Sequence, residues 1–134
     1  MCLLTLALDQ NRRFPLVIAA NRDEFFARPA ARLAWWTPEP GATQILGGRD
    51  LDAGGTWLGL TRSGRFAALT NVRGPTSARP DAPSRGSLVT GYLTGSLPAS
   101  GMAQQLASAD MRRYNGFNLL FGDRHELHCY NNVR

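Results

Sequence analysis

The stretch CLLTLALDQNRRFPLVIAANRDE, residues 2–24, decides which fold the sequence predicts. Residues 2–8 are nearly all apolar, a polar turn with a proline follows, and the apolar pattern resumes at Leu16. Two short apolar runs joined by a polar turn predict a β-hairpin whose strands are buried on both faces. Because the strands of a hairpin are antiparallel, the polar residues Asn21 to Glu24 should return beside the start of the chain.

The middle of the chain predicts a second hairpin and then two helices. Residues 56–62 and 66–73 flank a turn in which Gly64 is free to take a positive φ. Residues 87–95 and 102–114 carry apolar side chains at helical spacing. Two further strand-like runs follow, FNLLFGD and ELHCYNN. This order of elements predicts one α+β domain over residues 1–134 with a largely antiparallel sheet.

Two segments fall outside these elements, and the end of the chain also bears on the fold. Residues 24–55 form an irregular connection with one short strand near 44–46, and connections of this length in compact domains are typical of functional segments. Residues 74–86 are rich in Pro, Ser and Arg and predict an exposed, mobile loop. The chain ends directly after a strand-like run, so we expect either a fragment or an exposed sheet edge that a second copy of the chain would cover.

The charge of the chain does not indicate a nucleic-acid-binding protein. The formal net charge is +5, and all fifteen basic residues are arginines. They are scattered singly or in pairs, without the cluster or recognition motif that polyanion binding requires. With 43% hydrophobic residues, the composition suits a globular domain with a substantial core.

Two further classes of protein are disfavoured by the apolar runs and the cysteines. The run CLLTLAL is too short to span a membrane and lacks preceding basic residues, so we expect neither an anchor nor a signal peptide. Cys2 and Cys129 are the only cysteines and lie at opposite ends of the chain, which excludes a disulfide framework or a zinc cluster. These features favour the cytoplasm and predict no metal site.

Cys2 is the strongest candidate for a nucleophile. If Met1 is removed, the thiol and a free α-amino group belong to one residue, and the amine can act as general base for its own side chain. The alternative is a small apolar side chain packed in a strand, a common role of free cysteine. Asp23 could hold the α-ammonium, Arg22 could bind a substrate carboxylate, and Asn71 offers an amide donor for an oxyanion.

The polar cluster that follows the second strand has two interpretations. In the first, Asn21, Arg22, Glu24 and Arg73 contact a substrate while Cys2, Asp23 and Asn71 are catalytic. In the second, Asp23 caps the following turn and Arg22 pairs with Glu24. The expected proximity of the amino terminus favours the first interpretation.

These motifs resemble those of the NRDE family, also called the transport and Golgi organisation protein 2 family. The resemblance rests on MCLL at the start, ANRDEFFARP at 20–29, GGTWLGL at 54–60, TNVR at 70–73 and YNGFNLLFGD at 114–123. Because family members are usually longer, it implies that this chain is the N-terminal part of one.

The family in turn resembles the N-terminal nucleophile hydrolases, which implies a four-layer αββα sandwich with two central helices. In the bile-salt and penicillin V hydrolase branch the nucleophile is the cysteine at position 2, so Cys2, Asp23 and Asn71 match its site residues. That branch has its arginine three residues before the Asp, where this chain has Ala20. Because Arg22 adjoins Asp23, we expect the two side chains to face opposite sides of the strand.

The resemblance implies a hydrolase-like protein that acts on an amide or a thioester without a cofactor. The alternative is a non-catalytic carrier of haem or acyl lipid on the same scaffold. Other motifs are less informative. His125 and His128 would face opposite sides of a strand, and the pairs Phe25-Phe26 and Trp35-Trp36 are expected to cover the core rather than line a pocket. The glycine-rich segment 48–55 lacks the lysine and spacing of a phosphate-binding loop.

Overall fold

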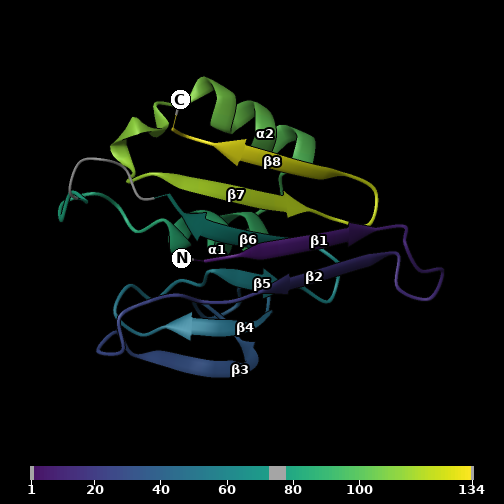
Figure 1. Ribbon diagram of the computed structural model, residues 1–134, viewed down its shortest axis with the longest axis horizontal. Helices are drawn as coiled ribbons and strands as arrows, with labels where there is room; N and C mark the ends of the chain where they lie inside the picture. The colour runs from purple at the N-terminus through teal and green to yellow at the C-terminus, as the bar shows by residue number, and fades with distance from the viewer. Residues whose placement is uncertain (1, 73–77, 134) are drawn as a thin grey trace.

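A computed structural model describes residues 2–72 and 78–133 and divides their strands between two antiparallel sheets (Figure 1). The first sheet is the hairpin of β1 (Leu4–Leu8) and β2 (Leu16–Ala20), in which Leu6 pairs with Ile18. The second is a six-stranded meander in chain order. Its strands are β3 (Ala30–Trp36), β4 (Ile45–Asp50), β5 (Leu58–Leu60), β6 (Phe66–Asn71), β7 (Phe117–Gly122) and β8 (Leu127–Asn131).

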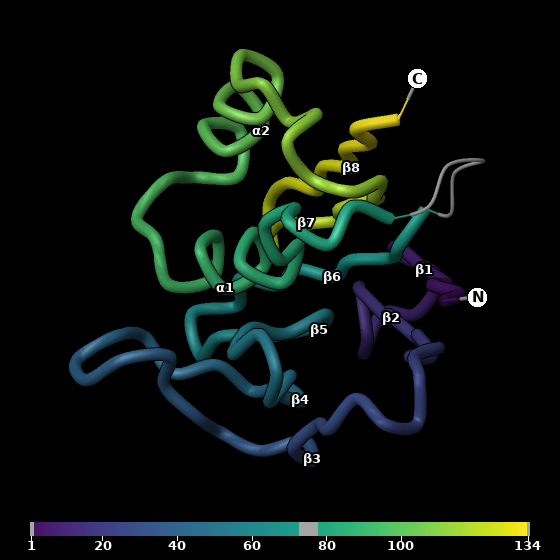
Figure 2. Tube along the Cα trace, turned by 90° about the vertical axis from the view of Figure 1, so that its left-hand side faces the viewer, coloured from purple at the N-terminus to yellow at the C-terminus, as the bar shows by residue number. Residues whose placement is uncertain are grey.

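The helices and the hairpin lie on opposite faces of the six-stranded sheet, as Figure 2 shows. Helix α1 (Gly86–Thr94) contacts β4 to β7, and α2 (Ala99–Ser108) contacts β8. A 3-10 helix, η1 (Met111–Arg113), leads into β7. The α+β class, the two helices and the antiparallel sheets are confirmed, and the helix, sheet and hairpin layers correspond to three layers of the predicted αββα sandwich.

The core lies between the helices and the six-stranded sheet. Leu93 from α1 and Leu106 from α2 are buried against Ile45, Leu119 and Phe121 of the sheet. Tyr92 meets Phe121 edge to face, with ring centroids 5.2 Å apart. Burial of these large apolar side chains holds the helix layer to the sheet.

The expectation that the first hairpin is buried on both faces is wrong. Leu4, Leu6 and Ile18 are half-buried on the inner face, whereas Leu3 and Val17, on the other face, are 68% and 46% exposed. Only one face of the hairpin meets another layer in the described residues. An apolar run of this length therefore does not by itself report burial on both faces.

Two boundaries differ from the sequence analysis. The connection over 24–55 contains two strands, because β3 pairs along β4 with a register irregularity between Ala31 and Ala34. The predicted helix over 102–114 is α2 followed by η1, since the Asp110 side chain accepts a hydrogen bond from the Arg112 backbone N–H and caps a separate turn.

The aromatic pairs also behave differently from one another. Phe25 and Phe26 are exposed, so the expectation that both cover the core is wrong, whereas Trp36 packs against the core. Among the described residues, no helix has the length and apolar character that crossing a bilayer requires.

Candidate functional site

The end of β2 returns to the start of the chain and holds Cys2 in place. The Asn21 backbone N–H donates to the Leu3 carbonyl at 3.1 Å, and the Leu3 N–H donates to Asn21 Oδ1 at 2.6 Å. One residue further along, the Asp23 N–H donates to Cys2 Sγ at 3.4 Å, and Sγ lies 3.8 Å from the Asp23 carbonyl. The hairpin register therefore seats the half-buried Cys2 sulfur against the backbone of Asp23.

Arg22 lies on a platform built by the GGTWLG motif. Its guanidinium carbon is 4.6 Å from the centroid of the Trp57 ring, a cation–π distance. Trp57 in turn packs against Gly48, where an added Cβ would lie 2.5 Å from the indole. The Nη2 atom of Arg22 is buried and has no hydrogen-bond partner within residues 2–72 and 78–133. A buried, unpaired guanidinium nitrogen is a donor available to a ligand.

A polar pocket of about 390 Å³ opens beside this platform. It contains three of the predicted site residues, Arg22, Glu24 and Asn71. Cys2 and Asp23 are not among its described lining residues. Its charged side chains are the arginines Arg22, Arg28, Arg79 and Arg85 and the carboxylates Glu24, Asp50 and Asp52.

Asn71 reaches this pocket from the end of β6. It pairs with Phe117 and shares the sheet face of Leu69, the side that the helices cover. Its side-chain amide has no hydrogen-bond partner in the part of the chain that the structure describes. Arg73, the remaining predicted substrate contact, lies outside the described residues.

Arg85 is a pocket residue that the sequence analysis missed. Its Nη1 donates to the Gly116 carbonyl at 2.8 Å. The pKa of Arg85 is lowered, chiefly by burial and to a smaller extent by the charge of Arg28. The charges of Glu24 and Cys2 oppose this shift, so the guanidinium lies within electrostatic range of the candidate nucleophile. A lone arginine in a Pro/Ser/Arg-rich segment carries no signal that distinguishes it from a solvated one.

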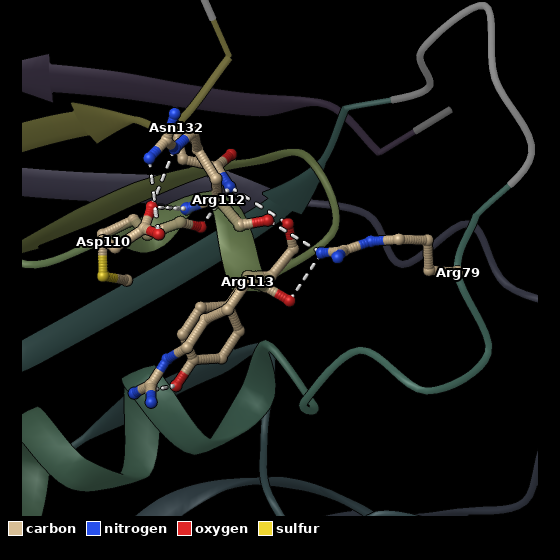
Figure 3. A network of polar contacts seen from close by, with 7 residues as sticks. Arg79, Asp110, Arg112, Arg113 and Asn132 are labelled. Carbon is tan, nitrogen blue, oxygen red and sulfur yellow. Dashed lines mark hydrogen bonds and ion pairs between the residues drawn. The ribbon is translucent and has the colours of Figure 1, made fainter.

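The segment that carries Arg85 is attached to the body of the protein over its described residues. Arg79 Nη2 donates to the Arg112 and Arg113 carbonyls at 2.7 and 2.6 Å (Figure 3). The Arg79 backbone also exchanges hydrogen bonds with the Asn115 amide, at 2.9 and 3.0 Å. Most of residues 78–85 are exposed, as expected, but these contacts tether the segment to the body of the protein. Residues 79, 80 and 82–85 form a wall of the pocket.

Asp50 closes another side of the pocket and has a structural role. Its carboxylate accepts from Arg28 Nε at 2.8 Å and from the Asp52 and Ala53 N–H groups at 3.0 and 3.1 Å. Burial opposes ionisation of Asp50, but the Arg28 hydrogen bond and the backbone donors outweigh it and lower its pKa. The glycine-rich segment around it is thus a capped turn.

A second, apolar cavity of about 610 Å³ lies between the hairpin and the six-stranded sheet. It is near the far end of β1 from Cys2, with Leu8, Leu16 and Ile18 on one side and Leu46 and Leu60 on the other. His125 is at its rim, whereas His128 pairs with Glu126 at 2.9 Å and stacks on Phe121. No cluster of three or more metal-binding side chains occurs among the described residues.

The chain is similar to a known protein family and to several of its members. The family model described as Transport and Golgi organisation 2 matches residues 1–134. Transport and Golgi organization 2 homologs of Mus musculus and Homo sapiens are each 35% identical over 97% of the chain, which covers 49% of either relative. The Drosophila melanogaster protein is 39% identical over 70% of the chain and 35% of its own length. The chain thus spans about half the length of the mouse and human relatives.

Proposed function

This chain belongs to the Transport and Golgi organisation 2 family, and on that premise we propose that it is an N-terminal cysteine hydrolase that acts on an amide or a thioester. The observation that carries the proposal is the seating of Cys2 Sγ at 3.4 Å from the Asp23 N–H. The same turn delivers Arg22 and Glu24 to a polar pocket. A nucleophile needs orienting donors and a nearby substrate pocket, and the turn after β2, which contacts Cys2 and carries Arg22 and Glu24, supports the proposal on both counts.

The chemistry begins with the removal of Met1, which frees the α-amine of Cys2. The amine takes the thiol proton, and the thiolate attacks the acyl carbon to form a C–S bond. The Asn71 amide, together with a backbone N–H, stabilises the oxyanion, and Asp23 holds the ammonium. As the intermediate collapses, the ammonium returns the proton to the leaving nitrogen or sulfur. Water then hydrolyses the acyl-enzyme, which regenerates the thiol.

The remaining polar residues of the motif divide between positioning and binding. Asn21 accepts the Leu3 N–H and keeps the chain start in register with β2, so we assign it a positioning role. Arg22 and Glu24 lie in the pocket and contact the substrate. Arg73 stays a predicted contact. We also propose that the protein works in the cytoplasm, where reducing conditions keep Cys2 a thiol, and that a second copy could cover an open edge strand, β3 or β8.

The decisive experiment is intact-mass analysis followed by iodoacetamide labelling. Because Cys129 is exposed and would also react, the background is Cys129→Ser. We expect a mass lower by one methionine residue, one alkylation at Cys2, and a trapped acyl adduct with a thioester probe. Cys2→Ser in this background should give no thioether adduct. Retained Met1, or alkylation without any acyl adduct, contradicts the proposed mechanism.

The second candidate function, a carrier of acyl lipid or haem, is favoured by the apolar cavity. Its volume of about 610 Å³ falls in the range of small-molecule sites, and leucines dominate its walls. Titration of a fatty acyl probe or haem against the wild type and Cys2→Ser separates the two functions. Binding that survives the substitution, with no turnover in either protein, supports the carrier.

A further inference from the structure

Two arginines of the polar pocket are left without a carboxylate partner. Arg28 is neutralised by Asp50, and Arg79 is held by backbone carbonyls. In contrast, neither Arg22 nor Arg85 forms an ion pair within the described residues. Glu24 is near enough to act on Arg85 but does not pair with it in the described structure.

Both guanidinium groups are held in fixed positions and desolvated in part. Arg22 is fixed by its stack on Trp57, and its Nη2 is buried without a partner. Arg85 uses Nη1 for the Gly116 carbonyl, which leaves further N–H donors of its planar fork without a partner among the described residues. A guanidinium remains charged in proteins, so its partial burial without a directly paired carboxylate is unfavourable, and an anion that pairs with it offsets that cost.

We propose that Arg85 and Arg22 form an anion-binding subsite of this pocket, so that the substrate of Cys2 carries a carboxylate or a phosphate in addition to its reactive acyl group. Planar guanidinium donors match either oxyanion with two parallel hydrogen bonds. The proposal rests on the proposed function for the identity of the reacting group, whereas the subsite itself is a binding property and can be tested without turnover.

The test measures binding to Cys2→Ser, which cannot complete the proposed reaction. The carboxylate arm compares glutaryl and pentanoyl thioesters of N-acetylcysteamine, and the phosphate arm compares pentanoyl thioesters of pantetheine with and without a 4′-phosphate. We expect at least one anionic probe to bind more tightly than its neutral counterpart. Arg85→Gln should weaken binding of that probe by about 10- to 100-fold, as should Arg22→Gln, with little effect on the neutral one. The arm that responds identifies the anion.

A matched control is available at Arg62, whose guanidinium stacks 4.0 Å from the Trp35 centroid and does not line the pocket. Arg62→Gln removes the same charge from a similar arginine–tryptophan pair and should leave binding unchanged. If Arg85→Gln fails to fold, two measurements still test the subsite: the comparison of anionic and neutral probes on Cys2→Ser, and the effect of Arg22→Gln. Equal affinity for the anionic and neutral probes in both arms, or an equal loss in Arg62→Gln, would overturn the subsite.

The two proposals fail in different ways. Turnover by the wild type without discrimination between charged and neutral thioesters removes the subsite and leaves the hydrolase. Arginine-dependent binding of an anionic probe with no acyl adduct at Cys2 removes the hydrolase and leaves the subsite.

Discussion

At the scale of single residues, neighbouring side chains of the NRDE motif are used for different purposes. The Asn21 carboxamide accepts the Leu3 N–H, and the Asp23 backbone contacts the Cys2 sulfur. Arg22 and Glu24 are in the pocket instead. Four consecutive polar residues thus hold the chain start in place and supply the charges beside it.

Asp50 gives a residue-scale prediction about stability. Its carboxylate is 17% exposed and accepts three hydrogen bonds, one of them from Arg28. Asp50→Asn should lower the free energy of unfolding by about 1–2 kcal/mol, because the charge-assisted bond and part of the turn cap are lost. Urea denaturation at neutral pH measures the change. Asp52→Asn is the control, since its carboxylate accepts no hydrogen bond within residues 2–72 and 78–133.

The pH dependence of the same variant has a defined sign. The pKa of Asp50 in the folded state lies below its ordinary value, so its contribution is complete above the unfolded-state pKa and is lost as the pH falls through the folded-state pKa. The stability difference between wild type and Asp50→Asn should therefore shrink below about pH 4. A difference that instead grows with acidification would contradict this assignment of the pKa.

At the scale of elements, the GGTWLG segment, which leads into β5, packs against the start of α1. A Cβ at Gly55 would lie 2.8 Å from the Gly86 carbonyl carbon. Thr56 is buried, and its hydroxyl donates to the Leu58 carbonyl at 2.9 Å. Backbone contact at this junction positions Arg85, the residue that precedes α1.

Gly55→Ala should destabilise the protein by about 1–3 kcal/mol, because backbone atoms of the helix must move to admit the methyl group. The matched control is Gly91→Ala in the middle of α1, where an added Cβ has no neighbour within 4 Å. That change should stabilise by about 0.5–1 kcal/mol through helix propensity. Thermal unfolding of the two variants measures both effects, and equal shifts would contradict the close approach.

The second element-scale prediction concerns the pocket wall at residues 78–85. Arg79→Ala removes both hydrogen bonds to the η1 carbonyls. Amide hydrogen exchange over residues 78–85 should then become roughly tenfold faster. Arg112→Ala is the control, because its exposed side chain pairs, within the described part of the chain, with Asp110 alone and exposed pairs contribute little. Comparable acceleration in the two variants would show that lost charge, not lost tethering, is responsible.

At the scale of the whole molecule, the two sheets are unequally covered. Helices cover one face of strands β4 to β8, whereas the opposite face of the sheet is met by a two-stranded hairpin and keeps an apolar cavity. The position of Cys2 depends on this hairpin layer, because the residue lies just before β1 and is held by the residues that follow β2.

Ile18→Asp should loosen the hairpin layer, because Ile18 faces the apolar cavity and a carboxylate there is costly to desolvate. In the Cys129→Ser background, alkylation of Cys2 should become about tenfold faster, which corresponds to about 1.4 kcal/mol of lost local stability. Val17→Asp is the matched control one residue away, on the exposed face of the same strand. If Val17→Asp accelerates alkylation equally, the inner face does not hold the hairpin in place.

Features that depend on residues close in the sequence were predicted correctly, whereas features that depend on contacts between distant residues were missed. Turns and helices were identified because glycines such as Gly64, with φ of +86°, and apolar side chains at helical spacing act locally. The edge strand β3 was missed because its alanines and arginine have low strand propensity and its pairing with β4 decides its conformation. Arg85 was missed because its burial depends on contacts with Gly116, 31 residues away.

The amino-acid sequence by itself determined the class of fold, the family, and the return of Asn21 to Glu24 to the chain start, because hairpin register and motif spacing are local properties of the chain. Only the tertiary structure decided that the hairpin is covered on one face, that residues 78–85 form a pocket wall, and that Arg22 and Arg85 lie in one pocket without carboxylate partners among the described residues. Those features depend on which distant side chains meet once the layers have packed, and the periodicity of the sequence does not predict such contacts.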